Sequence, residues 1–302
     1  MKVLLLGANS QLGSDLVPAL SRHELIVTTR AEVALQTQAP RYLLDLQNIT
    51  AMRQLVLRVR PEVIINTTAF HRVDDIERDA AMALIMNAHV PHQLALVSCE
   101  TNAALLHVST DYVFDGAKRA PYDESDPISP LSAYGTSKAA GEMLIRNAWH
   151  KHFIVRSTGL YGLAGSSGKG GNFVNTMLRL ARAGKPIRVV ADQVCTPTFT
   201  ADLAAQIAAL IATEAFGTMH ITNAGECSWH DFAAEIFRQA HLAPDFGATT
   251  SAAFGAQARR PAYSVLANNA IREMGMLPLR PWQVAVADYL SLQAGAASIG
   301  AG

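Results

Sequence analysis

The sequence predicts an α/β protein built on a doubly wound parallel sheet, with a smaller α/β domain at the C-terminal end. Short apolar runs alternate with longer amphipathic runs in the first half of the chain, which is the pattern of repeated βαβ units. The short runs are apolar throughout, so helices should cover both faces of the sheet. After residue 156 this alternation becomes less regular, which indicates a second domain.

The expected elements of the first half follow directly from these runs. The expected strands are Lys2–Leu6, Leu25–Thr28, Val63–Asn66, Ala104–Ser109 and His152–Arg156. The expected helices are Gln11–Leu20, Thr50–Val59, Ala80–Cys99 and Leu131–Trp149.

The second half mixes a flexible stretch with further short elements. Gly162–Gly171 holds five glycines and two serines and predicts a mobile substrate loop. The expected elements after it are a strand at Pro186–Val190 and helices at Asn172–Ala183, Ala201–Ala212, Trp229–His241 and Pro281–Gln293. We expect disorder from Ala294 onward.

Composition and charge exclude several classes of protein. The 302 residues are 50% hydrophobic and 17% charged with a formal net charge of zero, and no basic stripe for nucleic acid is present. The apolar runs are far shorter than the roughly 18 residues of a membrane span. Three cysteines and a start without a charged leader predict a cytoplasmic protein.

The turn after the first strand has the form of a phosphate-binding loop. Glycine at the strand exit permits a tight turn, and a glycine in the first helical turn lets free N–H groups face a pyrophosphate. The loop consists of Gly7, Ala8, Asn9, Ser10, Gln11, Leu12 and Gly13. It resembles a dinucleotide fingerprint in which Ser10 replaces the middle glycine. The loop predicts a Rossmann-type domain over residues 1–157, and an ordinary strand-to-helix turn is the alternative.

The end of the second strand predicts which dinucleotide binds. Arg30 at this position favours the 2′-phosphate of NADPH, since a base there accepts a phosphate and an acid there binds ribose hydroxyls. Glu32 lies two positions later and keeps NADH as the alternative cofactor. Asp45 and Leu46, after the next short run, suit the adenine edge of the site.

A tyrosine and a lysine four residues apart predict proton chemistry. In the stretch SAYGTSK, Tyr134 and Lys138 share one face of the expected helix. A free tyrosine has a pKa near ~10, and an adjacent ammonium lowers that value, so we expect Lys138 to act on Tyr134. Thr110 directly follows the expected strand Ala104–Ser109 on the same side. There it can hold a substrate oxygen while Tyr134 transfers a proton and a cofactor transfers hydride.

Together these residues resemble the short-chain dehydrogenase/reductase superfamily, which carries Tyr-x-x-x-Lys with a Ser or Thr upstream. Further segments are similar to the dTDP-4-dehydrorhamnose reductases, which are extended members that act on nucleotide sugars. The similar segments include Ile65–Ala69, Val73–Asp74, Ser109–Gly116, Asn172–Phe173, Asp192–Gln193 and Thr196–Thr198.

The resemblance implies an activity and a set of contacts. The activity is NAD(P)H-dependent reduction of the 4-keto group of a dTDP-linked 6-deoxy-hexulose, which supplies dTDP-L-rhamnose for polysaccharide. Implied cofactor contacts, beside the glycine turn, are Thr67, Thr68, Ala69, Tyr134 and Lys138. Implied substrate contacts are Asp111, Tyr112, Asn172, Phe173 and Arg260. The substrate domain is expected over 158–302, with a part at about 185–220 returning to the Rossmann sheet.

One departure from the resemblance concerns specificity. Gly159 stands where the reductases carry a tryptophan beside the sugar, so the substrate could be a different nucleotide-linked ketosugar. We expect Trp229 to anchor a helix start in the core. Some members bind magnesium at a dimer contact, with Asp15 and Asp202 in comparable places; we assign no metal, and the resemblance allows a homodimer.

Two other functions stay open at this point. One is a nucleotide-sugar epimerase or dehydratase that keeps its NAD bound, although Tyr112 follows Asp111 where dehydratases have a second acid. The other is a non-catalytic reductase-like subunit that regulates a partner enzyme.

Overall fold

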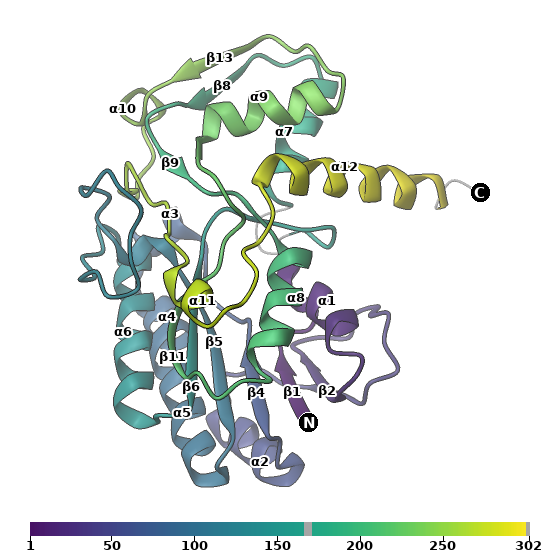
Figure 1. Ribbon diagram of the computed structural model, residues 1–302, viewed down its shortest axis with the longest axis vertical. Helices are drawn as coiled ribbons and strands as arrows, with labels where there is room; N and C mark the ends of the chain where they lie inside the picture. Colours follow the sequence, from purple (N-terminus) through teal and green to yellow (C-terminus); the bar gives the residue numbers. More distant parts are fainter. Residues whose placement is uncertain (166–170, 300–302) are drawn as a thin grey trace.

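The computed structural model describes residues 1–165 and 171–299, with side chains as far as residue 295. Its largest element is a parallel sheet of seven strands: β1 (Lys2–Leu6), β2 (Glu24–Thr29), β3 (Arg41–Leu43), β4 (Val63–Asn66), β5 (Ala104–Thr110), β6 (His152–Ser157) and β11 (Gly217–His220). The spatial order is β11-β6-β5-β4-β1-β2-β3 (Figure 1). The doubly wound sheet and the five predicted strands are confirmed; β3 and β11 had not been predicted.

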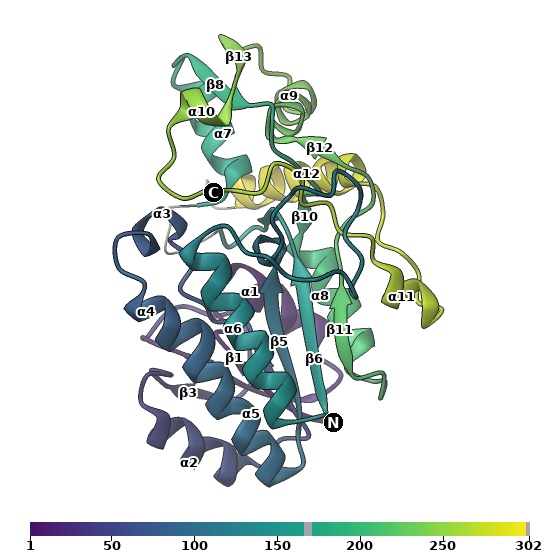
Figure 2. The ribbon, with the colours of Figure 1, turned by 90° about the vertical axis from the view of Figure 1, so that its left-hand side faces the viewer.

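Side chains alternate along the strands between two helical layers. Val3 and Leu5 of β1 pack in one core with α1 (Gln11–Ala19) and α8 (Thr200–Leu210). Leu4 and Leu6 pack in the other with α2 (Ile49–Val59) and α5 (Val90–Thr101). Figure 2 shows α2 and α5 beside α6 (Ala133–Ala148) on this second face. A sheet covered on both faces explains why its strands are apolar throughout.

The helix predicted over 80–99 is interrupted by a π-helical turn. It consists of α4 (Ala81–Leu84), a π-helical stretch at Ile85–His89, and α5. Pro91 lacks an N–H, so the carbonyl of Asn87 loses its usual helical partner and the turn widens. That carbonyl lies against α6, where a Cβ added to Gly141 would sit 2.0 Å from it. Only glycine therefore allows α6 to pack this closely.

The remaining elements form a second layer beyond the carboxyl ends of the strands. They include α7 (Phe173–Arg182), α9 (Trp229–Gln239) and α12 (Trp282–Ile299). Their small sheets pair β7 (Leu160–Tyr161) with β10 (Thr198–Phe199), β8 (Ile187–Val190) with β13 (Phe246–Thr249), and β9 (Val194–Cys195) with β12 (Cys227–Ser228). The core of this layer is rich in aromatic residues, including Tyr161, Phe199, Phe232, Trp282 and Tyr289.

The chain crosses between the two layers more than once. In the stretch 185–220, β8 lies in the second layer, whereas α8 packs beside α1 and β11 extends the large sheet at β6. The return to the sheet therefore starts at residue 200 and not at 185. The division of the chain into domains at residue 157 stays a prediction.

Three short helices, α3 (Val73–Ile76), α10 (Ser251–Phe254) and α11 (Asn269–Glu273), complete the fold. The expected disorder from Ala294 is wrong as far as Ile299, because α12 continues through these alanine-rich residues and projects from the body (Figure 1). Most of the loop expected at Gly162–Gly171 lies outside the described residues. Across the described ranges, no helix is both long and apolar enough to cross a bilayer.

Candidate active site

The three predicted catalytic residues come from two neighbouring elements. Thr110 is the last residue of β5, and Tyr134 and Lys138 lie one turn apart at the start of α6. The helix begins there because the Ser132 hydroxyl accepts a hydrogen bond from the backbone N–H of Gly135, at 3.1 Å. All three residues therefore lie at the carboxyl edge of the sheet, where open parallel sheets bind their ligands.

The environment of Tyr134 keeps its hydroxyl protonated. Burial raises the pKa of Tyr134 to about 12; a hydrogen bond with the Thr110 side chain lowers this pKa, and the nearby charge of Asp111 raises it. Burial thus outweighs the other effects on this pKa, and the lowering that was expected from Lys138 stays a prediction.

Lys138 points into the sheet and is almost completely buried. Its Nζ donates to the carbonyl oxygen of Val108 at 2.7 Å and lies 2.9 Å from Nε2 of His107. Burial lowers the pKa of Lys138 to about 8, although the carboxylate of Glu142 one turn further raises it. A lysine with this pKa exchanges a proton near neutral pH.

Asp111 is a buried carboxyl group immediately after Thr110. Its oxygens accept hydrogen bonds from the hydroxyls of Thr158, at 2.8 Å, and Thr110, at 3.1 Å. Burial still raises the pKa of Asp111 to about 6. The next residue, Tyr112, turns its ring edge toward Tyr134 with 5.7 Å between ring centroids. The predicted substrate residues Asp111 and Tyr112 thus lie beside the predicted proton donor.

The glycine turn has the tight geometry that its sequence predicts. Gly7 has a φ of +83°, and a Cβ there would lie 2.7 Å from Cγ2 of Thr68. A Cβ on Gly13 would lie 2.1 Å from the carbonyl oxygen of Gly7. Ser10 turns inward: its hydroxyl caps α1 by accepting from the Gly13 N–H at 2.9 Å and lies 2.9 Å from the hydroxyl of Thr67.

The other predicted cofactor residues divide into buried and exposed ones. Leu12 and Leu46 are buried in the two cores of the sheet, so only their backbone is available to a ligand. Arg30 and Asp45 are exposed at the ends of β2 and β3, while Asn9 and Ala69 are half-buried. Gln11 donates through Nε2 to the Leu160 carbonyl at 2.9 Å, which connects the turn to the second layer.

A large cavity opens between the α3 segment and the second layer. Its volume is about 630 Å³, which is in the range of ligand sites. The lining residues include Arg72, Asp74, Tyr112, Phe173, Met177, Arg188, Gln193, Trp229 and Arg260. Three of the five predicted substrate residues, Tyr112, Phe173 and Arg260, therefore line one cavity.

Aromatic and charged side chains form two sides of this cavity. The rings of Phe173 and Trp229 pack with centroids 4.8 Å apart, so Trp229 lines the cavity as well as contacting the core. The expectation for Trp229 was thus incomplete. Arg260 forms an ion pair of 2.9 Å with Asp74, which leaves part of its guanidinium fork for a ligand.

Asn172 and Gly159 lie close to this region without lining the cavity. The Asn172 amide caps α7, accepting from Asn175 N–H at 2.9 Å, and donates to the Gly162 carbonyl at 2.8 Å, so its predicted substrate contact stays a prediction. Gly159 has a φ of +58°, and a Cβ there would lie 3.0 Å from the Cα of Pro197. A tryptophan at this position would therefore be strained in this backbone.

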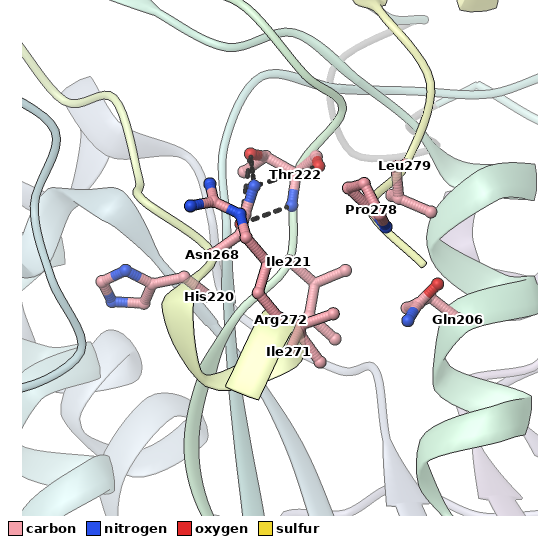
Figure 3. A pocket seen from close by; sticks show the side chains of 9 residues that line it. All are labelled: Gln206, His220, Ile221, Thr222, Asn268, Ile271, Arg272, Pro278 and Leu279. Carbon is pink, nitrogen blue, oxygen red and sulfur yellow. Dashed lines mark hydrogen bonds between the residues drawn. The ribbon is translucent and has the colours of Figure 1, made fainter. Parts of the chain in front are cut away.

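A second cavity, drawn in Figure 3, lies between α8, β11 and α11. Its volume of about 10 Å³ holds one water molecule at most. Asn268 and Thr222 exchange hydrogen bonds at its edge. Its size excludes a ligand site.

The acids considered for magnesium are held by other side chains. Asp202 accepts two hydrogen bonds of 2.9 Å from Arg280, and Asp15 accepts one from the Thr200 hydroxyl. In the described ranges, no three His, Cys, Asp or Glu side chains gather as a metal site would require.

His107 is the site residue that the sequence did not reveal. It lies inside β5, three residues before Thr110, and its ring bridges Lys138 and Asn66. A histidine within an apolar strand is an unusual choice, and that is the one signal that could have indicated it.

The fold and the site are those of an extended short-chain dehydrogenase/reductase: a parallel sheet, a glycine turn, and Thr110, Tyr134 and Lys138 at the carboxyl edge of the sheet. The family model described as RmlD substrate binding domain matches residues 1–294. The chain belongs to this family.

Relatives and solved structures agree with this assignment. The chain is 36% identical to the spore coat polysaccharide biosynthesis protein SpsK of Bacillus subtilis, with 96% of each chain covered. It is 38% identical to a probable dTDP-4,6-dihydroxy-2-methyloxan-3-one 4-ketoreductase of Streptomyces antibioticus, covering 95% of this chain and 94% of the relative.

The structure of dTDP-4-dehydrorhamnose reductase from Bacillus anthracis in complex with NADP superposes on this chain with a TM-score of 0.88. The two sequences are 37% identical, and the match covers 96% of this chain and 99% of the other.

The raised pKa of Asp111 predicts a pH-dependent stability. The folded protein binds this proton more tightly than the unfolded chain, in which the pKa of Asp111 is near 3.8. The contribution of Asp111 to the free energy of unfolding is therefore full below pH 4 and is lost as the pH rises to about 6. Urea unfolding at several pH values should show that the free energy of unfolding of wild type falls by about 3 kcal/mol across this window, relative to that of Asp111→Asn.

A matched control is Asp115→Asn. Asp115 is half-buried, and its pKa is lowered, mainly by the backbone N–H of Ala117. Its contribution to the free energy of unfolding therefore grows as the pH rises, so the difference between wild type and Asp115→Asn should change with pH in the opposite direction. Parallel pH curves for wild type and Asp111→Asn would contradict the assignment.

Proposed function

We propose that this chain reduces the 4-keto group of a nucleotide-linked 6-deoxy-hexulose with a reduced nicotinamide dinucleotide, as the dTDP-4-dehydrorhamnose reductases do. The observation that carries the proposal is the position of Tyr134: a buried, protonated phenol beside Tyr112, which lines the large cavity. Membership of the family supports the same reaction.

The roles of the residues follow from this arrangement. Thr110 holds the carbonyl oxygen of the sugar by a hydrogen bond, and Tyr134 gives that oxygen a proton. When bound, the dinucleotide supplies the hydride and, once oxidised, a positive charge that makes Tyr134 more acidic. The backbone N–H groups at the start of α1 hold its pyrophosphate, since Gly7 and Gly13 leave that approach open.

NADPH is the proposed cofactor and NADH the alternative. Arg30 is exposed just beyond β2, where it can reach a 2′-phosphate. Glu32, the acid that would favour NADH, is occupied in an ion pair with Arg41 at 2.5 Å. The solved reductase from Bacillus anthracis was crystallised with NADP.

The large cavity suits a nucleoside diphosphate sugar. Phe173 and Trp229 offer aromatic faces for a base, and Arg260 offers a planar fork for phosphate oxygens. Gly159 places no side chain beside the sugar, so the chain should accept 4-ketosugars that differ in the ring positions facing this residue.

We place the reaction in the cytoplasm, where nucleotide sugars are made and thiols stay reduced. The three cysteines are unpaired in the structure, which agrees with a reducing compartment. Assembly as a homodimer stays a prediction.

Removing the phenol hydroxyl should abolish turnover without preventing cofactor binding. Tyr134→Phe keeps the ring but has no proton to give, so we expect kcat with NADPH and a dTDP-4-ketosugar to fall by about 10²-fold or more, with an unchanged Kd for NADPH. The control Tyr42→Phe alters a tyrosine in β3, at the far edge of the sheet. Full activity of Tyr134→Phe would remove the proton-transfer role.

Neutralising Arg30 should weaken NADPH selectively. In Arg30→Ala we expect the KM for NADPH to rise about tenfold, because one charge-assisted contact is lost, and the KM for NADH to stay unchanged. Arg22→Ala, another exposed arginine near β2, is the control. An equal change for both cofactors would show that Arg30 does not read the 2′-phosphate.

A further inference from the structure

The α3 segment, residues 70–78, lies between the start of α6 and the second layer (Figure 2). Near its end, Oε1 of Glu77 accepts a hydrogen bond of 2.7 Å from the backbone N–H of Ala133. Ala133 is the first residue of α6 and precedes Tyr134, and an N–H at this position has no acceptor within its own helix. Glu77 therefore fixes the first turn of the helix that carries the proposed proton donor.

The beginning of the α3 segment is connected to α6 as well. The side-chain oxygen of Asn87 accepts from the backbone N–H of Phe70, and its amide nitrogen donates to the Phe70 carbonyl, both at 2.8 Å. That nitrogen also donates to the hydroxyl of Ser137 at 3.0 Å, and this hydroxyl donates to the Tyr134 carbonyl at 2.7 Å. Between these two connections the side chain of Ile76 is fully buried. The segment thus has a fixed position relative to α6.

Asp74 connects the α3 segment to the part of the chain that carries Arg260. Its Oδ1 accepts from the backbone N–H of Ala258 at 3.1 Å, and its Oδ2 accepts from the Arg260 guanidinium at 2.9 Å. Nε of Arg78 donates to the side-chain oxygen of Gln257 at 2.9 Å and adds a further bond between the two stretches. Asp74 and Arg260 both line the large cavity. The direction of the Arg260 fork in this cavity is therefore set from the α3 segment.

We propose that Glu77 and Asp74 are positioning residues on one segment: Glu77 fixes Tyr134 at the start of α6, and Asp74 fixes Arg260 in the large cavity. These roles rest on the proposed reductase function, in which Tyr134 gives a proton and Arg260 binds phosphate oxygens. The carbonyl and the diphosphate belong to one substrate molecule, so the separation of these two side chains decides whether both ends are held at once. The α3 segment sets this separation before the substrate binds.

The two carboxylates use their oxygens in different ways. Glu77 accepts from the Ala133 N–H through one oxygen, and the amide oxygen of a glutamine accepts the same bond. Asp74 uses both oxygens as acceptors, because a donor faces each of them. An asparagine has one acceptor, and its NH₂ group would oppose either the Ala258 N–H or the Arg260 guanidinium. We therefore expect glutamine to replace Glu77, whereas asparagine does not replace Asp74.

The first test reads both contacts at backbone amides and needs no substrate. In protein labelled with ¹⁵N-alanine, hydrogen exchange is followed at Ala133 and Ala258, identified by the signals that Ala133→Ser and Ala258→Ser lack. Exchange at Ala133 should become about tenfold faster in Glu77→Leu and change little in Glu77→Gln. Exchange at Ala258 should become about tenfold faster in Asp74→Asn. Unchanged exchange at either amide would overturn the proposal, whether or not the chain is a reductase.

The matched control for the exchange test is Glu62→Leu. Glu62 is exposed, as Glu77 is, and it also accepts from a backbone N–H, that of Lys2 at 2.6 Å, but it lies at the amino edge of the sheet. Its replacement should leave exchange at Ala133 and Ala258 as in the wild type. Faster exchange there would overturn the assignment, because the loss of any surface contact would then have the same effect.

The second test separates the two roles by steady-state kinetics with NADPH and a dTDP-4-ketosugar. Glu77→Leu should lower kcat about tenfold with little change in the KM for the nucleotide sugar, and Glu77→Gln should restore most of kcat. Asp74→Asn should raise the KM for the nucleotide sugar about tenfold, and the Kd for dTDP by a similar factor. Glu100→Gln is the control, since it alters a surface ion pair of 2.6 Å with Arg53, between α5 and α2.

The kinetic outcomes distinguish positioning from a general loss of structure. A merely structural role would change kcat and KM together in each variant, and Glu77→Gln would not restore them, which would refute the proposal. An active wild type with an unchanged kcat in Glu77→Leu would also refute it and leave the proposed function standing. Absence of reductase activity in the wild type would refute the proposed function and leave the exchange test valid.

Discussion

The structure depends on the burial of one amine between α6 and the end of β5. Lys138 reaches the Val108 carbonyl and His107 only because α6 approaches its neighbours closely. Two glycines permit this: a Cβ on Gly135 would lie 2.2 Å from the Tyr112 carbonyl oxygen, and Gly141 faces the π-helical turn in the same way. The backbone that positions Tyr134 and the backbone that buries Lys138 are therefore the same.

Burial also sets the electrostatics of the site. It acts on each group against the charged form: the pKa values of Tyr134 and Asp111 rise, and that of Lys138 falls. The result is a site that keeps a proton on the phenol. Such a site suits reduction, in which the phenol must be protonated before hydride arrives and a positive charge develops beside it during the reaction.

The sequence predicted the parts of the fold and the site that depend on local patterns. Apolar runs gave the strands, and the spacing of Tyr134 and Lys138 gave a shared helical face, because both signals lie within one element. The π-helical turn was missed because its cause, Pro91, acts through a carbonyl packed against another helix. The helix through residue 299 was missed because its composition resembles that of a flexible tail.

The electrostatics of the site required the tertiary structure. The contact of Asn66 with His107 exists because the two residues are register partners on β4 and β5. The inward turn of the Ser10 hydroxyl depends on Thr67 in another loop. The rise in the pKa of Tyr134 could not be predicted from the sequence, since spacing along a helix gives the neighbour of a group but not the depth at which it is buried.

Isotope transfer tests the central claim of a carbonyl reduction at this site most directly. The protein is incubated with NADPH carrying deuterium at the transferable position and a dTDP-linked 4-keto-6-deoxyhexose, and the product is analysed by mass spectrometry and NMR. The account predicts one deuterium at C4 of the sugar and one NADPH consumed per product. A sugar that changes configuration without deuterium, or that forms without added NADPH, would contradict it.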